Sequence, residues 1–298
     1  MKNKSALLSG ISMFFCFCIL VAGGSFGKTI GKGQVTVSIL FSEVFAFLLP
    51  TLFLLLLLRG KDKLSIPLTI KKVKPKNFKL AIYIGISTCI LSFLLNIMFL
   101  ILGSQDVSGI NPAAILGRDI QQNFFMYLLS IVIIPAIMEE IYIRGAIFSI
   151  FSRYAGTWVS MLISSLVFAM LHGSLYNFVG PFIAGLSFSW LTYVFKSVWP
   201  AVVAHAVNNL GYLFILWVTD TYSAFGIWNY IPYVCIFLLL LFTYLILANV
   251  EKLLLSGRVP KFKIQSQISN QSIRTIALNP GAIVFIVSFF AKTVFKII

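Results

Sequence analysis

The sequence predicts an all-α polytopic membrane protein with about eight transmembrane helices. Of its 298 residues, 59% are hydrophobic and only 10% are charged, and the mean hydropathy is +0.99. A soluble domain carries about 25% charged residues. The apolar residues form blocks long enough to cross the roughly 30 Å hydrocarbon layer, which takes about 20 helical residues. These blocks are continuous, as from Leu54 to Leu58, rather than alternating in polarity as in a β-barrel.

Eight blocks are expected to cross the membrane. They cover residues 6–23, 38–58, 80–102, 124–150, 158–172, 178–195, 199–218 and 229–249. The first follows Lys2 and Lys4, as the apolar region of a secretory signal peptide would, but its length of about 17 residues favours a retained helix. A further segment, 281–298, carries Lys292 and Lys296 on one face and fits an interfacial amphipathic helix at least as well as a ninth span.

The net charge of +15 is concentrated in two stretches, one between the second and third blocks and one after the eighth. The positive-inside rule places both stretches, and with eight crossings both chain ends, in the cytoplasm of a cell-membrane protein. Lys28 and Lys32, in the first external loop, depart from the rule. We expect the basic loops to contact anionic lipid and not nucleic acid. The residues concerned are Arg59, Lys61, Lys63, Lys71, Lys72, Lys74, Lys76 and Lys79, then Lys252, Arg258, Lys261, Lys263 and Arg274.

Composition divides the chain into three zones. Residues 1–123 hold three plain apolar helices and the basic loop, 124–218 hold four helices with most of the intramembrane polar groups, and 219–298 hold an apolar helix and a polar tail. The middle zone is the predicted core. The four cysteines lie inside apolar blocks without metal-ligand spacing, which indicates packing residues.

Two adjacent glutamates in the fourth block predict a polar intramembrane active site. A charge at a helix centre costs about 2.5–3.5 kcal/mol, so Glu139 and Glu140 require a role. Glu140 and Arg144 are one turn apart and can pair. Glu139 is rotated by about 100° and has no cation on its face, which suits a general base. Pro135 is expected to break the helix ahead of the pair, and broken membrane helices line wet cavities.

The two histidines each have a companion one turn away. Phe168 precedes His172 by four positions, and Asn209 follows His205 by four. The inventory of a carboxylate, two imidazoles and a carboxamide on three helices fits hydrolysis of an amide by activated water. Glu139, assisted by His172, is expected to activate the water, and His205 and Asn209 to stabilise the oxyanion.

The order Glu139-Glu140-x-x-x-Arg144, Phe168-x-x-x-His172 and His205-x-x-x-Asn209 resembles the CAAX protease and bacteriocin-processing (CPBP, or Abi) family of eight-helix membrane proteins. The resemblance covers about 124–218 and implies that Glu139 activates water with His172. It also implies that His205 and Asn209 bind the oxyanion, with Glu140, Arg144 and Phe168 in support. Its bacterial members process peptides or confer bacteriocin immunity, so the expected substrate is a hydrophobic peptide or a membrane protein.

Three alternatives remain open at the level of sequence. No cofactor is expected, but Glu139, His172 and His205 have the composition of a hydrolytic zinc site with an open position. A transporter could use Glu43, the glutamate pair and the histidines as an ion relay, although no internal repeat supports one. The third alternative is a non-catalytic immunity or scaffold protein that only binds its target.

Overall fold

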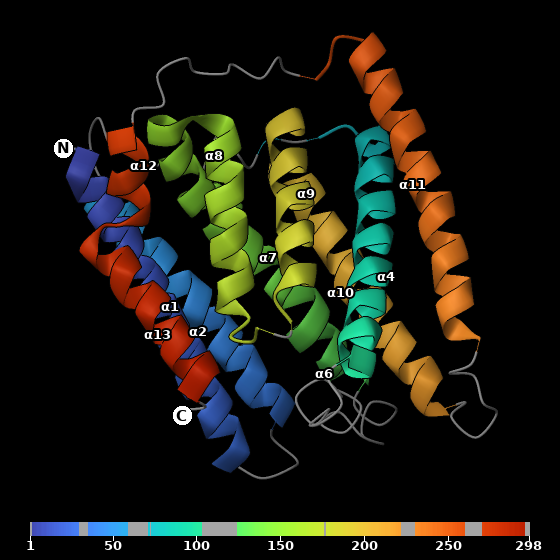
Figure 1. Ribbon diagram of the computed structural model, residues 1–298, viewed down its shortest axis with the longest axis horizontal. Coiled ribbons are helices and arrows are strands. Elements are labelled where there is room, and N and C mark those ends of the chain that lie inside the picture. The colour runs from blue at the N-terminus through green and yellow to red at the C-terminus, as the bar shows by residue number, and fades with distance from the viewer. Residues whose placement is uncertain are drawn as a thin grey trace.

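The protein is a bundle of helices that pack side by side (Figure 1). The computed structural model describes residues 2–29, 35–58, 71, 73–102, 124–175, 177–221, 230–259 and 270–295, and every regular element in these ranges is helical, which confirms the predicted all-α class. The elements are α1 (Lys2–Thr29), α2 (Val35–Leu57), the 3₁₀ turn η3 (Pro75–Asn77), α4 (Phe78–Leu102), α6 (Phe124–Tyr127), η6 (Leu128–Ile133), α7 (Ile134–Glu140), η7 (Ile141–Ile147), α8 (Phe148–Leu171), α9 (Val179–Phe195), α10 (Trp199–Thr221), α11 (Ile231–Leu255), α12 (Asn270–Ala277) and α13 (Pro280–Phe295).

Six helical stretches of the described chain are long and apolar enough to cross a membrane, and two apolar helices are shorter. One of the six, Phe124–Leu171, has 48 residues. At about 1.5 Å per residue it would be more than twice as long as the hydrocarbon layer is thick. The stretch turns back at Gly156, whose φ of 74° is a conformation that glycine adopts without steric cost. With that stretch counted as two crossings, α9 brings the number to eight, in agreement with the prediction of about eight, and α13 is a further apolar helix of the bundle.

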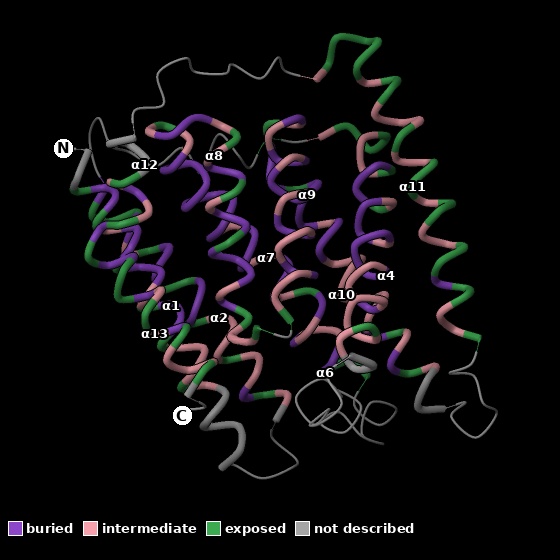
Figure 2. The backbone as a smooth tube through the Cα atoms, in the orientation of Figure 1, coloured by how far each residue is buried: buried purple, intermediate pink, exposed green. Residues whose placement is uncertain are grey.

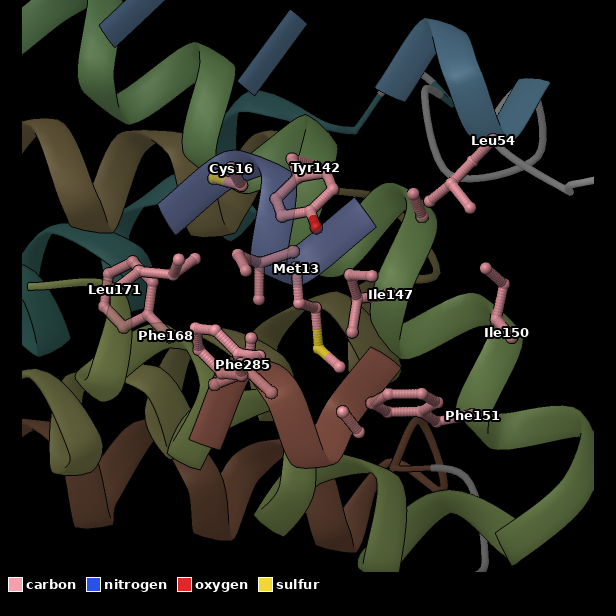
Figure 3. Packing of buried hydrophobic residues seen from close by; sticks show 14 of the residues in the cluster. Met13, Cys16, Leu54, Tyr142, Ile147, Ile150, Phe151, Phe168, Leu171 and Phe285 are labelled. Carbon is pink, nitrogen blue, oxygen red and sulfur yellow. The ribbon is translucent and has the colours of Figure 1, made fainter. Parts of the chain in front are cut away.

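One core joins the first two helices, η7, α8 and α13. Cys16 of α1 lies beside Tyr142, Met13 extends toward Phe151, and Phe285 of α13 packs near Phe168 (Figure 3). Lipid tails are as apolar as these side chains, so the helices associate through close packing and polar contacts. One such contact joins the hydroxyl groups of Ser12 and Tyr142 at 3.0 Å.

A second core joins α4, α9 and α10. Purple, buried stretches run along the inner faces of these helices in Figure 2. By contrast, α11 exposes most of its side chains, as expected of a helix at the lipid-facing edge of a bundle.

The last helix, α13, runs beside α1 in the same direction. Gly10 meets Gly281, and seven residues further along α1 the ring of Phe17 lies 5.7 Å from that of Phe285. A side chain at either glycine would collide with backbone of the other helix, so this approach requires glycine. A helix lying flat at the interface would not follow α1 in this way, so the packing favours placement of residues 280–295 within the bundle. In this arrangement α13 ends at the opposite side of the bundle from the start of α1 (Figure 1), which differs from the predicted position of both chain ends on one side.

Parts of the predicted topology lie outside the described residues. These are positions 30–34, 59–70 and 72 of the predicted first and basic loops, 103–123 and 222–229 of the predicted external loops, and 260–269 and 296–298 of the tail.

Candidate active site

The helix that carries the two glutamates is irregular on both sides of them. The π-helical turns η6 and η7 flank α7, and Pro135 stands in the first turn of α7. Proline has no N–H, so the carbonyl of Ile131, four residues earlier, loses its usual α-helical donor. The backbone stays helical at Ile133 and Ile134, so the predicted break is instead a local change to π-helical bonding. The change leaves the carbonyl of Ile131 without its α-helical donor and able to accept from a side chain of another helix.

Glu140 is the centre of a buried polar cluster. Its Oε1 accepts hydrogen bonds from Arg144 Nη1 at 2.8 Å and from His205 Nδ1 at 2.9 Å. Glu140 and Arg144 have no solvent-exposed surface, and His205 is 3% exposed. The predicted Glu140–Arg144 pair is confirmed. The bond to His205 was not predicted, and it joins the supporting pair directly to a motif histidine.

Aromatic rings and a backbone carbonyl complete the surroundings of Arg144. Its Nη2 donates to the carbonyl oxygen of Gly185 at 3.0 Å, and its guanidinium carbon lies 4.5 Å from the ring centre of Phe168 and 5.5 Å from that of Phe188. Cation–π contact of this kind is worth about 2 kcal/mol or more when desolvated. His205 stacks on Phe188 at 5.4 Å. Both rings therefore stabilise the cluster, and Phe168 has the supporting place predicted for it.

His172 has one ring nitrogen bonded to the backbone and the other without a partner among the described residues. Its Nδ1 lies 2.9 Å from the carbonyl oxygen of Phe168. A carbonyl only accepts, so Nδ1 carries the proton and Nε2 of the neutral ring keeps a lone pair. The side chain is exposed and lines a pocket at the end of α8. The spacing of Phe168 and His172 thus reflects a backbone bond that sets the tautomer.

Asn209 is held from two directions. Its Nδ2 donates to the carbonyl oxygen of Ile131 at 2.9 Å, which is the carbonyl that Pro135 leaves without a helical donor. Its Oδ1 accepts from Asn208 Nδ2 at 3.1 Å. On the far side, Thr88 Oγ1 of α4 lies 3.1 Å from Asn208 Oδ1. These bonds fix which way the carboxamide of Asn209 faces and leave one of its two N–H groups for another acceptor.

A pocket of about 230 Å³ brings the histidines and Asn209 together between α4, α8, α9 and α10. The motifs predicted a hollow shared by Glu139, His172, His205 and Asn209, and the pocket contains the two histidines and Asn209 but not Glu139. The residues that line it are Ser92, Asn96, Phe168, His172, Asn177, Pro181, Ala184, Phe188, His205, Asn208, Asn209 and Tyr212.

Glu139 does not line this pocket. It is 7% exposed, on a helix that packs against α2 as well as α10. The carboxylate of Glu43 on α2 and the thiol of Cys16 on α1 are among its electrostatic neighbours, together with Glu140 and Arg144. The structure therefore places the adjacent glutamates differently: Glu140 toward His205, and Glu139 toward the first two helices.

The described residues contain no group of three or more His, Cys, Asp or Glu side chains that could hold a metal ion. Glu139, His172 and His205 therefore do not come together here as the zinc site considered from the sequence.

Motif spacing did not identify Thr88, Asn208 or the polar residues that line the pocket from α4. The signal was present in part: Thr88, Ser92 and Asn96 recur every four residues in an otherwise apolar helix, which places them on one face. A polar face on a membrane helix turns toward protein or water.

The fold and the site together define a multi-pass membrane protein with a polar cluster between its helices. Residues 121–211 match the family model described as Rce1-like, Type II CAAX prenyl endopeptidase Rce1-like. The matched segment contains Glu139, Glu140, Arg144, His172, His205 and Asn209, and the match confirms the resemblance to the CAAX protease family. Comparisons with curated proteins and with solved structures gave no match.

Proposed function

We propose that this chain is an intramembrane peptidase that hydrolyses a hydrophobic peptide or a membrane-anchored protein with water. The observation that carries the proposal is the pocket in which His172, His205 and Asn209 meet, each with one polar atom fixed by a described partner. The match of this segment to a family of endopeptidases supports the same reading.

His172 is suited to accept a proton from water. Its Nε2 keeps a lone pair in the neutral ring and has no partner in the described part of the chain, and the ring lines the pocket. In the proposed reaction the water oxygen attacks the substrate carbonyl carbon while its proton passes to the base. That proton then moves to the departing amine, so the products are a carboxylic acid and an amine. Glu139 lies outside this pocket, so we propose that it assists His172 through the electrostatic field of the site, where Glu140 and Arg144 are its neighbours, and not by contact. A positioned base such as His172 contributes about 10²- to 10⁴-fold.

His205 and Asn209 are proposed to stabilise the oxyanion. Asn209 retains one N–H after its bond to Ile131. His205 donates through Nδ1 to Glu140, and its Nε2 donates to an oxyanion when the ring carries both protons. Preorganised donors in such a site are worth about 10²- to 10³-fold each. Glu140 and Arg144 then act by holding His205, and Asn208 acts by holding Asn209.

Hydrolysis is tested with purified protein, a library of short hydrophobic peptides and ¹⁸O-labelled water. We expect one ¹⁸O atom in each new carboxyl group, detected by mass spectrometry, and unchanged product formation with a chelator. A matched variant, His172→Phe, keeps a ring against Phe168 but removes the base, and we expect it to lose cleavage. If no peptide is cut by folded wild-type protein, the peptidase proposal is overturned and the binding alternative is favoured.

We further propose that the pocket faces away from the cytoplasm. It is lined by the later half of α4, the end of α8 and the beginning of α9, whereas the basic stretches precede α4 and follow α11. The positive-inside rule assigns the basic side to the cytoplasm.

This orientation predicts which thiols react in intact cells. In a background without native cysteines, a membrane-impermeant thiol reagent should label Asn177→Cys in intact cells, because Asn177 is exposed at the pocket. The control Arg258→Cys, exposed after α11, should react only once the cells are permeabilised. The reverse pattern would show that the pocket faces the cytoplasm.

A further inference from the structure

Three polar side chains in the pocket are not engaged by the motif residues. Ser92 and Asn96 of α4 and Tyr212 of α10 line the pocket, and none has a side-chain hydrogen bond with another described residue. All three are half-buried. A polar group inside a bilayer that lacks a partner is costly, so such groups are retained where water or a ligand satisfies them.

The two helices that carry these residues run in the same direction. Gly85 of α4 packs against Ala204 and Val207 of α10, and further along Cys89 packs against Gly211. Polar residues therefore follow in the same order on both helices. Thr88 of α4 lies beside Asn208 of α10, and beyond this pair come Ser92 and Asn96 on α4 and Tyr212 on α10. They form a polar track that begins at the motif residues and continues toward the ends of α4 and α10.

The chemistry of this track matches that of a peptide main chain. A carboxamide offers donors and an acceptor, and a phenol offers one of each, so Asn96 and Tyr212 together can pair with the N–H and C=O of one or two peptide units. The pocket is smaller than the about 300–1,000 Å³ that is typical of sites for drug-sized ligands. It therefore fits a short stretch of chain and not a folded segment.

We propose that Asn96 and Tyr212 form a subsite that binds the main chain of the substrate beside the bond to be cut. The inference rests on the proposed peptidase function and deepens it. A helical segment keeps its N–H and C=O groups bonded internally, so the subsite selects substrates that are extended or unwound at this position. Selection by backbone bonding rather than by side-chain shape permits many sequences.

The test compares the Asn96→Leu variant with wild type on peptides that wild type cleaves. In each peptide of the series one amide is replaced by an ester, which removes a single N–H. We expect Asn96→Leu to raise KM about 5- to 10-fold, the effect of one lost hydrogen bond, with kcat nearly unchanged. One ester position should raise KM for wild type and have no further effect in Asn96→Leu. Tyr212→Phe should raise KM in the same way.

The control is Asn249→Leu, because Asn249 lies on α11 and its side chain bonds to the carbonyl of Leu245. We expect no change in KM. Additive effects of Asn96→Leu and of every ester position would overturn the subsite. The peptidase proposal fails separately: if wild type cuts no peptide, the same ester series is measured as the Kd of a labelled peptide. If the effects of Asn96→Leu and of every ester on Kd simply add, the subsite is overturned. If one ester has no further effect on the Kd of Asn96→Leu, the subsite is supported.

Discussion

Replacement of Glu140 by leucine is expected to destabilise the protein by about 3–5 kcal/mol, because it leaves Arg144 charged, buried and without its carboxylate. Among the described residues, Arg144 would keep its bond to Gly185, its two aromatic contacts and the more distant charge of Glu139. His205 would also lose the acceptor for its Nδ1. The measurement is the free energy of unfolding in mixed detergent micelles, together with the amount of protein recovered from the membrane.

The matched variant is the double replacement Glu140→Leu and Arg144→Met. A buried ion pair exchanged as a whole for apolar side chains of similar volume often costs little or nothing, so the double variant should recover most of the lost stability. It should not recover peptide cleavage, since His205 remains without Glu140. Equal instability of the single and double variants would show that the unpaired charge is not the cause.

The predicted helices followed from hydropathy because a membrane span must satisfy its own backbone, so long apolar runs have few other structures to adopt. The gap expected between 150 and 158 contains Gly156, where the chain turns back. The packing of α13 was not predictable from its own residues. It depends on Gly10, which is 271 positions away from Gly281 in the sequence.

The contacts in the site also divide into those that the sequence predicts and those that it does not. The pair Glu140–Arg144 and the bond from His172 to Phe168 span one helical turn, so spacing along one helix predicted that these partners meet. The bonds from His205 to Glu140 and from Asn209 to Ile131 join different helices. Spacing carries no information on such bonds, because they depend on how the helices pack. The pattern at Pro135 indicated a break, but not which side chain would use the freed carbonyl.

Replacement of Glu139 by glutamine is expected to lower kcat about 10²- to 10⁴-fold, because the motif assigns this carboxylate to water activation even though it lies outside the pocket. Glutamine keeps the shape of the side chain and removes its ability to take up a proton, so KM and the midpoint of thermal unfolding should change little. Measured cleavage rates of one peptide over a range of concentrations give kcat and KM separately.

The matched control is Glu43→Gln, which removes a second intramembrane carboxylate among the electrostatic neighbours of Glu139. Glu43 lies on α2, outside residues 121–211 that match the family model and outside the glutamate motif, so its replacement should leave most of the activity. Full activity of Glu139→Gln beside an inactive His172→Phe would assign proton removal to His172 alone. Equal losses of kcat in Glu139→Gln and Glu43→Gln would instead indicate that the reaction needs both carboxyl groups.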